Sequence, residues 1–188
     1  MPAQTTDPHD VLQFNLQVLA QALALIGAHR QPQSPPFAQP VGAHLRHVIE
    51  HYEALLQPVV ANVVDYDRRP RDRSVERNPD VAQARVQALQ RRVTMLLDTP
   101  LDAPLQVRGL CGLAGEFAFA TASTLGRELA FVGSHAIHHF ALLQGHCKQH
   151  GIMLGDEFGR APSTVAHDRA TAQSTEETPC RQSAPLLA

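Results

Sequence analysis

The stretch SHAIHHFALLQGH, residues 134–146, combines an apolar helical repeat with a run of histidines. Apolar side chains recur at helical spacing before, within and after it. Ser123 or Thr124 can cap the start of this segment, and Gly151 follows its end. The pattern predicts one long helix over the whole span, and the rest of the chain is interpreted around it.

Three more helices are predicted upstream of this segment. Apolar repeats of helical period run over residues 12–27, 41–58 and 79–100. Four prolines make residues 31–40 a connecting loop, and the charged segment 65–78 lacks an apolar repeat. Between 101 and 122, short alternation around a glycine-rich turn predicts a β-hairpin.

These elements predict an all-α fold, a four-helix bundle with a short β-hairpin between the third and fourth helices. Residues 1–8 are expected to form a flexible N-terminus, and residues 9–163 the bundle domain. Residues 164–188 are polar, rich in Ser and Thr and free of aromatic side chains. Such a composition predicts a disordered tail.

The composition argues against several classes of function. The 188 residues carry a formal net charge of −2, which gives no general attraction to nucleic acid or to anionic membranes. We found no apolar run of membrane-spanning length and no secretion signal, and the three cysteines form no Cys-x-x-Cys motif. A cytoplasmic protein without nucleic-acid or membrane partners is expected.

The eleven histidines are the main indication of chemistry. His135 and His139 lie one helical turn apart, so both imidazoles can reach a single metal ion. His138 points about 100° away from His139 and can replace it only if the helix is rotated. Three imidazoles from two helices would suit a divalent transition metal, with zinc or nickel favoured and iron or manganese as alternatives.

The second predicted helix contains GAHLRHVIEH, residues 42–51, which offers three further candidate ligands. By helical projection the centre of its apolar stripe lies between Val48 and Tyr52. His44 and His51 lie nearer that centre than His47 does. The pattern alone therefore favours His44 or His51 as the inward-facing histidine.

Other polar residues were assigned supporting roles. Metal-bound histidines usually donate their second N–H to a carboxylate, and Glu128, Glu50 and Asp65 are the candidates. Glu128 is favoured because it lies seven residues before His135 on the same face. Arginine forks in the charged loop can hold a carboxylate or phosphate of a substrate. The candidate substrate-binding residues are Tyr66, Arg68, Arg69 and Arg71.

The pattern resembles the DinB superfamily, also called the YfiT-like metal-dependent hydrolases. The resemblance covers roughly residues 8–165 and rests on GxHLRHxxEH in the second helix and HxxHH at 135–139. YDRRPRD at 66–72 and DEFGRAPST at 156–164 resemble an uncharacterised bacterial subgroup. The resemblance implies a four-helix bundle with His47, His135 and His139 as metal ligands.

The same resemblance implies a metal-dependent enzyme acting on a small molecule, either a thiol transferase with a low-molecular-weight thiol or a hydrolase. Metal-bound water or thiol would be the nucleophile. The alternative is a bundle that binds or senses a metal without catalysis, with His44, His51 or His138 as a fourth ligand. A homodimer is a further expectation from the family.

Overall fold

The computed structural model describes residues 7–57 and 62–176. The helices are α1 (Pro8–Ala28), the π-helix η1 (Ala38–Gly42), α2 (Ala43–Leu56), α3 (Arg73–Arg77), α4 (Pro79–Thr94), α5 (Leu125–Gln149) and α6 (Pro162–Glu176). The strands are β1 (Val63–Asp65), β2 (Pro104–Cys111) and β3 (Phe117–Thr124).

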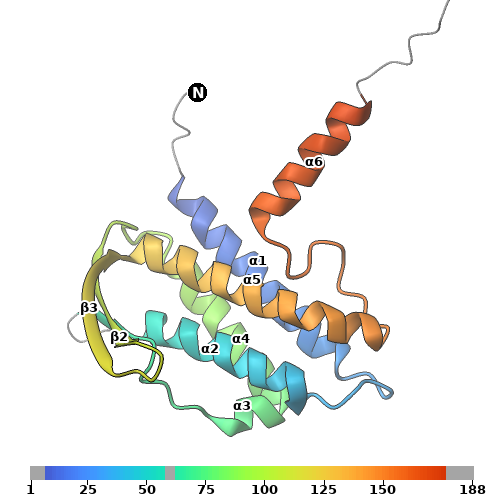
Figure 1. The fold of residues 1–188 in the computed structure, drawn as a ribbon, viewed down its shortest axis with the longest axis horizontal. Coiled ribbons are helices and arrows are strands. Elements are labelled where there is room, and N and C mark those ends of the chain that lie inside the picture. The colour runs from blue at the N-terminus through green and yellow to red at the C-terminus, as the bar shows by residue number, and fades with distance from the viewer. Residues whose placement is uncertain (1–6, 58–61, 177–188) are drawn as a thin grey trace, which may run out of the picture.

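Four helices, α1, α2, α4 and α5, pack side by side around one core (Figure 1). The apolar repeats found in the sequence supply that core, whose largest fully buried side chains include Leu19, Leu25, Ile26, Leu45, Ile49, Tyr52, Leu89, Leu129, Phe140 and Leu143. Capping residues mark where three of these helices begin. Asp7 caps α1, Asn78 caps α4 and Thr124 caps α5 through their side-chain oxygens.

A three-stranded sheet lies at the end of the bundle where α5 begins (Figure 1). Strands β2 and β3 form the expected hairpin and pair antiparallel, from Pro104 opposite Thr124 to Cys111 opposite Phe117. The tight turn between them uses Gly112 and Gly115, both at positive φ. β1 pairs parallel to the other side of β2, with Val64 opposite Val107.

The sheet makes the fold mixed α/β, so the prediction of an all-α bundle is wrong. The hairpin of β2 and β3 was expected, but the third strand of the sheet, β1, was not. β1 has three residues, too few to show an alternating pattern, and its partner lies about forty residues away along the chain. A parallel pairing of that kind leaves no local signal in the sequence.

Several predicted boundaries also differ from the structure. The segment 65–78, expected to be a loop, contains the short helix α3, which Asp72 caps. The helix predicted over 79–100 ends at Thr94. The π-helix η1 precedes α2, inside and just after the predicted proline loop.

The C-terminal segment was expected to be disordered from Thr164 onward, but residues 164–176 lie in α6. Pro162 suits the first turn of a helix, and ion pairs join Arg160 to Asp168 and Arg169 to Glu157. Residues 177–188 lie outside the described part of the chain. The flexible N-terminus was predicted over 1–8, of which Asp7 and Pro8 already form the start of α1.

Close contacts between α1, α2 and α5 hold the bundle in register. A Cβ added at Gly133 of α5 would lie 2.6 Å from Cε1 of Phe14 in α1, so the Phe14 ring packs directly against this glycine. Tyr52 of α2 donates a hydrogen bond to the buried Asn15 side chain of α1 at 2.7 Å. These contacts fix how α2 and α5 face each other.

Within the described residues, one helix is long and apolar enough to cross a membrane, over His9–Ala28. This helix is α1, and Leu12, Leu19, Leu25 and Ile26 on its apolar face are buried in the bundle. Core helices of this kind pass the same test of length and composition, so the finding is weak evidence for a membrane span.

Candidate metal centre

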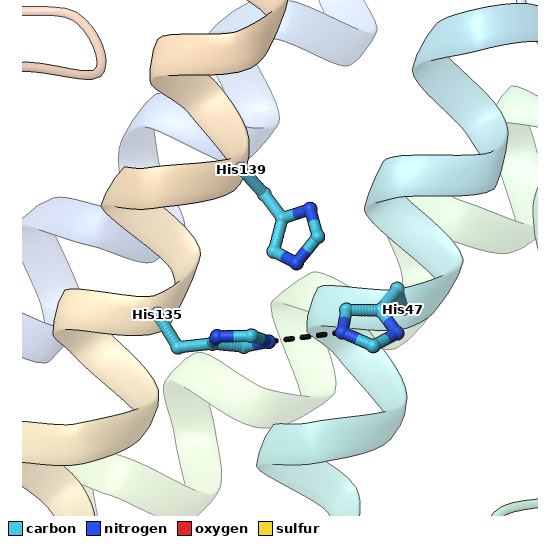
Figure 2. Close-up of side chains that lie close together, drawn as sticks. All are labelled: His47, His135 and His139. Atoms are coloured by element: carbon cyan, nitrogen blue, oxygen red, sulfur yellow. Dashed lines mark hydrogen bonds between the residues drawn. The ribbon is translucent and has the colours of Figure 1, made fainter. Parts of the chain in front are cut away.

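Helices α2 and α5 bring three histidines together. The potential ligand atoms of His47, His135 and His139 all lie within 4.8 Å of one another. His47 projects from α2 toward the two α5 histidines, and one ring nitrogen of His139 points at the contact between the other two rings (Figure 2). That contact joins Nε2 of His47 and Nε2 of His135 at 2.9 Å.

Two more histidines of α2 surround this triad. His44 Nδ1 lies 2.8 Å from His139 Nδ1, which leaves the other nitrogen of His139 for the triad. His51 is buried and its ring lies 4.2 Å from that of His47 and 4.7 Å from that of His135, between centroids. His51 Nδ1 donates to the carbonyl oxygen of His47 at 2.7 Å. His138 is exposed, and its ring centroid lies 5.7 Å from that of His139.

Burial keeps the triad neutral. Desolvation, followed by the neighbouring histidines, lowers the pKa of His47 to about 3 and that of His139 to about 4. The pKa of His135 is lowered by the same cause. Neutral imidazole is the form that binds a metal ion, so at pH 7 all three rings are in the ligating state.

Arg69 and Glu50 approach the triad from the α2 side. Arg69 Nη1 lies 3.1 Å from His47 Nδ1, and because arginine can only donate, this nitrogen of His47 must accept. Neutral His47 therefore carries its proton on Nε2 and donates it to His135. Glu50 is buried, and its Oε1 accepts from the backbone N–H of Asp72 at 2.7 Å.

The second oxygen of Glu50 has no hydrogen-bond partner among the described residues, although Arg69 Nη1 lies 3.6 Å away and Arg46 Nη1 3.9 Å away. Glu50 therefore reaches the triad through Arg69 and does not itself contact a histidine of the triad. The sequence had placed Glu50 beside the ligands; the arginine between them was not foreseen.

Glu128, the carboxylate favoured from the sequence, is bonded elsewhere. It is fully buried and accepts hydrogen bonds from Tyr66 OH at 2.7 Å, from Ser123 Oγ at 2.6 Å and from Arg127 Nη1 at 2.7 Å. Seven residues separate it from His135, about two turns or 10 Å along the helix. Its link to the triad is indirect, through the ring of Tyr66, which stacks on His51 at 5.5 Å between centroids.

The remaining predicted residues divide into two groups. Tyr66 and Arg69 border the histidines, as described above. Arg68 and Arg71 are exposed, and Arg68 lines a separate pocket with Arg108 and Phe119. Asp65 accepts from the backbone N–H groups of Asp67 and Arg68 at 3.0 Å, which holds the turn after β1.

Sequence reasoning also missed aromatic and hydroxyl contacts. Phe131 stacks on His135 with 5.6 Å between centroids, and Ser123 was considered only as a cap. Phe131 lies four residues before His135, a spacing that places both on one face of α5. That spacing was the available signal.

Comparison with known proteins gives limited information. No family model matches the chain, and no solved structure matches it. A protein named FK506-binding protein 5 from Rhizopus delemar is 30% identical over 118 residues, which is 62% of this chain and 31% of the relative. The chain thus spans about a third of the length of the curated relative it matches.

Proposed function

We propose that this chain is a DinB-like protein that binds one divalent transition metal through His47, His135 and His139, and that it uses the metal as a thiol transferase or hydrolase. The observation that carries the proposal is the convergence of these side chains from α2 and α5, with all ligand atoms within 4.8 Å of one another. A tetrahedral ion with bonds of 2.0–2.1 Å separates its ligand atoms by about 3.3 Å, which lies between the 2.9 Å contact of His47 with His135 and the 4.8 Å limit of the group.

The residues present fit such an ion. All three donors are neutral imidazoles, which suit zinc, nickel, iron and copper, and no cysteine belongs to the triad. Three protein ligands are also the usual number in catalytic zinc sites. When bound, a metal of this kind supplies a Lewis acid that activates water or a thiol near neutral pH.

The surrounding residues position the ligands. The contact between His44 Nδ1 and His139 Nδ1 at 2.8 Å orients the His139 ring, as an outer hydrogen-bond partner does in many metal sites. Tyr66, held by Glu128, packs against His51 and limits access of water on that side. Arg69 is the cation best placed to hold an anionic group of a substrate near the triad.

Binding of the metal through Nε2 of His47 changes the role of Arg69. The proton of His47 must then lie on Nδ1, where Arg69 now donates. Arg69 has to leave this nitrogen, and the free Oε2 of Glu50 is an acceptor 3.6 Å from its Nη1. The released guanidinium can pair with that oxygen or with a substrate anion.

A second candidate function is metal binding without catalysis. The observation that favours it is the position of His44 and His51, which lie against the triad and offer further imidazoles. A fourth protein ligand would close the coordination sphere and exclude substrate.

The first experiment is metal analysis of untagged protein by mass spectrometry. We expect about one equivalent of a transition metal in the wild type and in His138→Ala, which removes an exposed histidine of the same helix. His135→Ala and His139→Ala should lose it. Equal metal content in all four proteins, or none in any after incubation with zinc, nickel or manganese, would refute the site.

Cobalt substitution then separates the two functions. In the Co(II)-loaded protein, addition of a small thiol should produce a thiolate-to-cobalt charge-transfer band if the coordination sphere is open to substrate. A spectrum that does not change, in protein that holds one equivalent of cobalt, would favour the non-catalytic alternative.

A further inference from the structure

A second group of histidines lies at the opposite end of α5 from the sheet. His146 lies in the last turn of α5, His150 follows the last residue of that helix, and His29 follows the last residue of α1. The rings of His29 and His146 are stacked, with 5.7 Å between centroids and 12° between planes. The ring of His150 lies 4.4 Å from that of His146. We call these three residues the terminal cluster.

The hydrogen bonds of the terminal cluster direct its Nε2 atoms away from the backbone. His29 Nδ1 donates to the carbonyl oxygen of Leu25 at 2.9 Å, and His150 Nδ1 donates to that of His146 at 2.9 Å. In a neutral ring this leaves the lone pair on Nε2. Metal-binding histidines in proteins are oriented in the same way, by donation from the second ring nitrogen to a carbonyl oxygen.

Two of these nitrogens are buried without a partner. Within residues 7–57 and 62–176, Nε2 of His29 and Nε2 of His146 have no hydrogen-bond partner, and His29 as a whole is only 7% exposed. Buried polar atoms in folded proteins are nearly always bonded, so an unpaired pair on adjacent rings calls for a ligand. A metal ion, which accepts the electron pair of an unprotonated ring nitrogen, is a ligand that can satisfy both atoms.

The environment keeps the rings suited to this role. Burial, with His150 and His29 as neighbours, lowers the pKa of His146. The edge of the Phe37 ring lies against His29, with 6.4 Å between centroids, and limits contact with water on that side. His150 is exposed, so its ring can turn without disturbing the core.

We propose that His29, His146 and His150 form a second binding site for a divalent transition metal such as Zn²⁺, Ni²⁺ or Cu²⁺. His29 and His146 provide the fixed pair of ligands, and a rotation of the His150 side chain completes the site. Because metal binding fixes the exposed His150 side chain and removes its conformational entropy, this site binds more weakly than the triad. The proposal does not depend on the function of the triad, since the two groups share no residue.

The test is a calorimetric titration of the full chain with Zn²⁺. We expect two equivalents in the wild type, the second at least tenfold weaker than the first. His135→Ala/His139→Ala should retain only the weaker one. His29→Phe, which keeps an aromatic ring in the stack, and His150→Ala, which changes an exposed residue, should each lose or weaken the second equivalent at least tenfold.

His167→Ala is the control, because it removes an exposed histidine of α6 that belongs to neither group. Retention of the second equivalent in both His29→Phe and His150→Ala would overturn the proposal. An equal loss in His167→Ala would also overturn it, because it would show general binding to surface histidines. Loss of only the first equivalent in the triad variant supports two separate sites.

Discussion

The triad and the terminal cluster use the same arrangement of sequence with different results. Each has two histidines spaced four residues apart, both within α5 in the triad and at the end of α5 in the terminal cluster. The third histidine is His47 of α2 in one case and His29, just after α1, in the other. In the triad, nitrogens of His47 and His135 contact each other at 2.9 Å, whereas in the terminal cluster two nitrogens have no hydrogen-bond partner among the described residues. The i, i+4 spacing places two histidine rings on one side of the helix. The position of the third histidine decides whether the nitrogens of all three rings come together.

The facing residues differ in how their backbones are held. His47 lies within α2, which packs along α5. His29 comes after the end of α1, at φ −83° and ψ 3°, and its Nδ1 is anchored to the preceding turn. Both side chains are therefore held in place, but the proposed site of His29 also needs a rotation of the exposed His150 side chain, whereas the triad needs no such change.

Removal of metal should produce the largest difference between the two groups. We expect a chelator to lower the Tm of metal-loaded wild type by about 10 °C, because a ligand at a thousand times its Kd adds about 4 kcal/mol to the free energy of unfolding. His135→Ala/His139→Ala should show a much smaller shift, and His29→Phe a shift close to wild type. Calorimetric melting with and without chelator measures this, and equal shifts in all three would contradict the ranking of the sites.

Substitution of Gly133, two residues before His135, should lower the stability of the fold that holds the triad. Gly133→Ala places a Cβ 2.6 Å from Phe14, so we expect overpacking to cost about 2 kcal/mol and to lower the Tm by about 5 °C. The matched control is Gly145→Ala on the same helix, where an added Cβ meets no atom within 4 Å. Thermal melting of both variants provides the measurement, and an unchanged Tm in Gly133→Ala would show that the contact between α1 and α5 is loose.

Removal of Arg69 should strengthen metal binding at the triad, because its guanidinium occupies a ring nitrogen of His47. Arg69→Met frees Nδ1 of His47 and removes a positive charge near the metal, so we expect affinity to rise about tenfold, or about 1.4 kcal/mol. Arg69→Lys keeps the charge without the guanidinium group, so its metal affinity should lie between those of the wild type and Arg69→Met. Competition with a chelating dye gives the affinities. Weaker binding in Arg69→Met would mean that Arg69 supports the ligands instead of opposing them.

The smallest expected effect concerns how the stability of chelator-treated protein depends on pH. The pKa of His47 is about 3 and that of His139 about 4 in the folded state, below an unfolded value near 6.5. The unfolded chain therefore binds more protons between these values, so stability is full above about pH 6.5 and falls as the pH decreases toward 4.

Because both side chains are half exposed, we expect a decrease in Tm of only about 2 °C between pH 7 and pH 5 from these two residues. His47→Asn/His139→Asn should reduce the slope of Tm against pH. A slope identical to that of the wild type would show that other groups, such as those of the terminal cluster, control the acid sensitivity.

The long helices could be predicted from the sequence because their signals are local. Apolar repeats and capping residues of α1, α4 and α5 lie within each segment. β1 was missed because three residues acquire strand structure only by pairing with the distant β2. The short helix α3 was missed for a similar reason, since Val75 is the single buried residue in a charged segment.

The candidate site shows what the helical projection can and cannot predict. It favoured His44 or His51 over His47, and His51 is indeed buried, yet its ring bonds to the backbone of its own helix. Residues at the edge of an apolar stripe point toward the neighbouring helix, whereas those at its centre point into the core. His47 lies at such an edge, and its choice from the sequence rested on the family resemblance.

The separation of the triad along the chain has a consequence for its assembly. His47 and His135 lie 88 residues apart, so the cross-helix contact forms only after α5 has been made and has packed against α2. Until then His135 and His139 offer two ligands at most, and His47 one. Capture of the proposed metal would therefore follow folding of the bundle, and the ion would stabilise a chain that already has its fold.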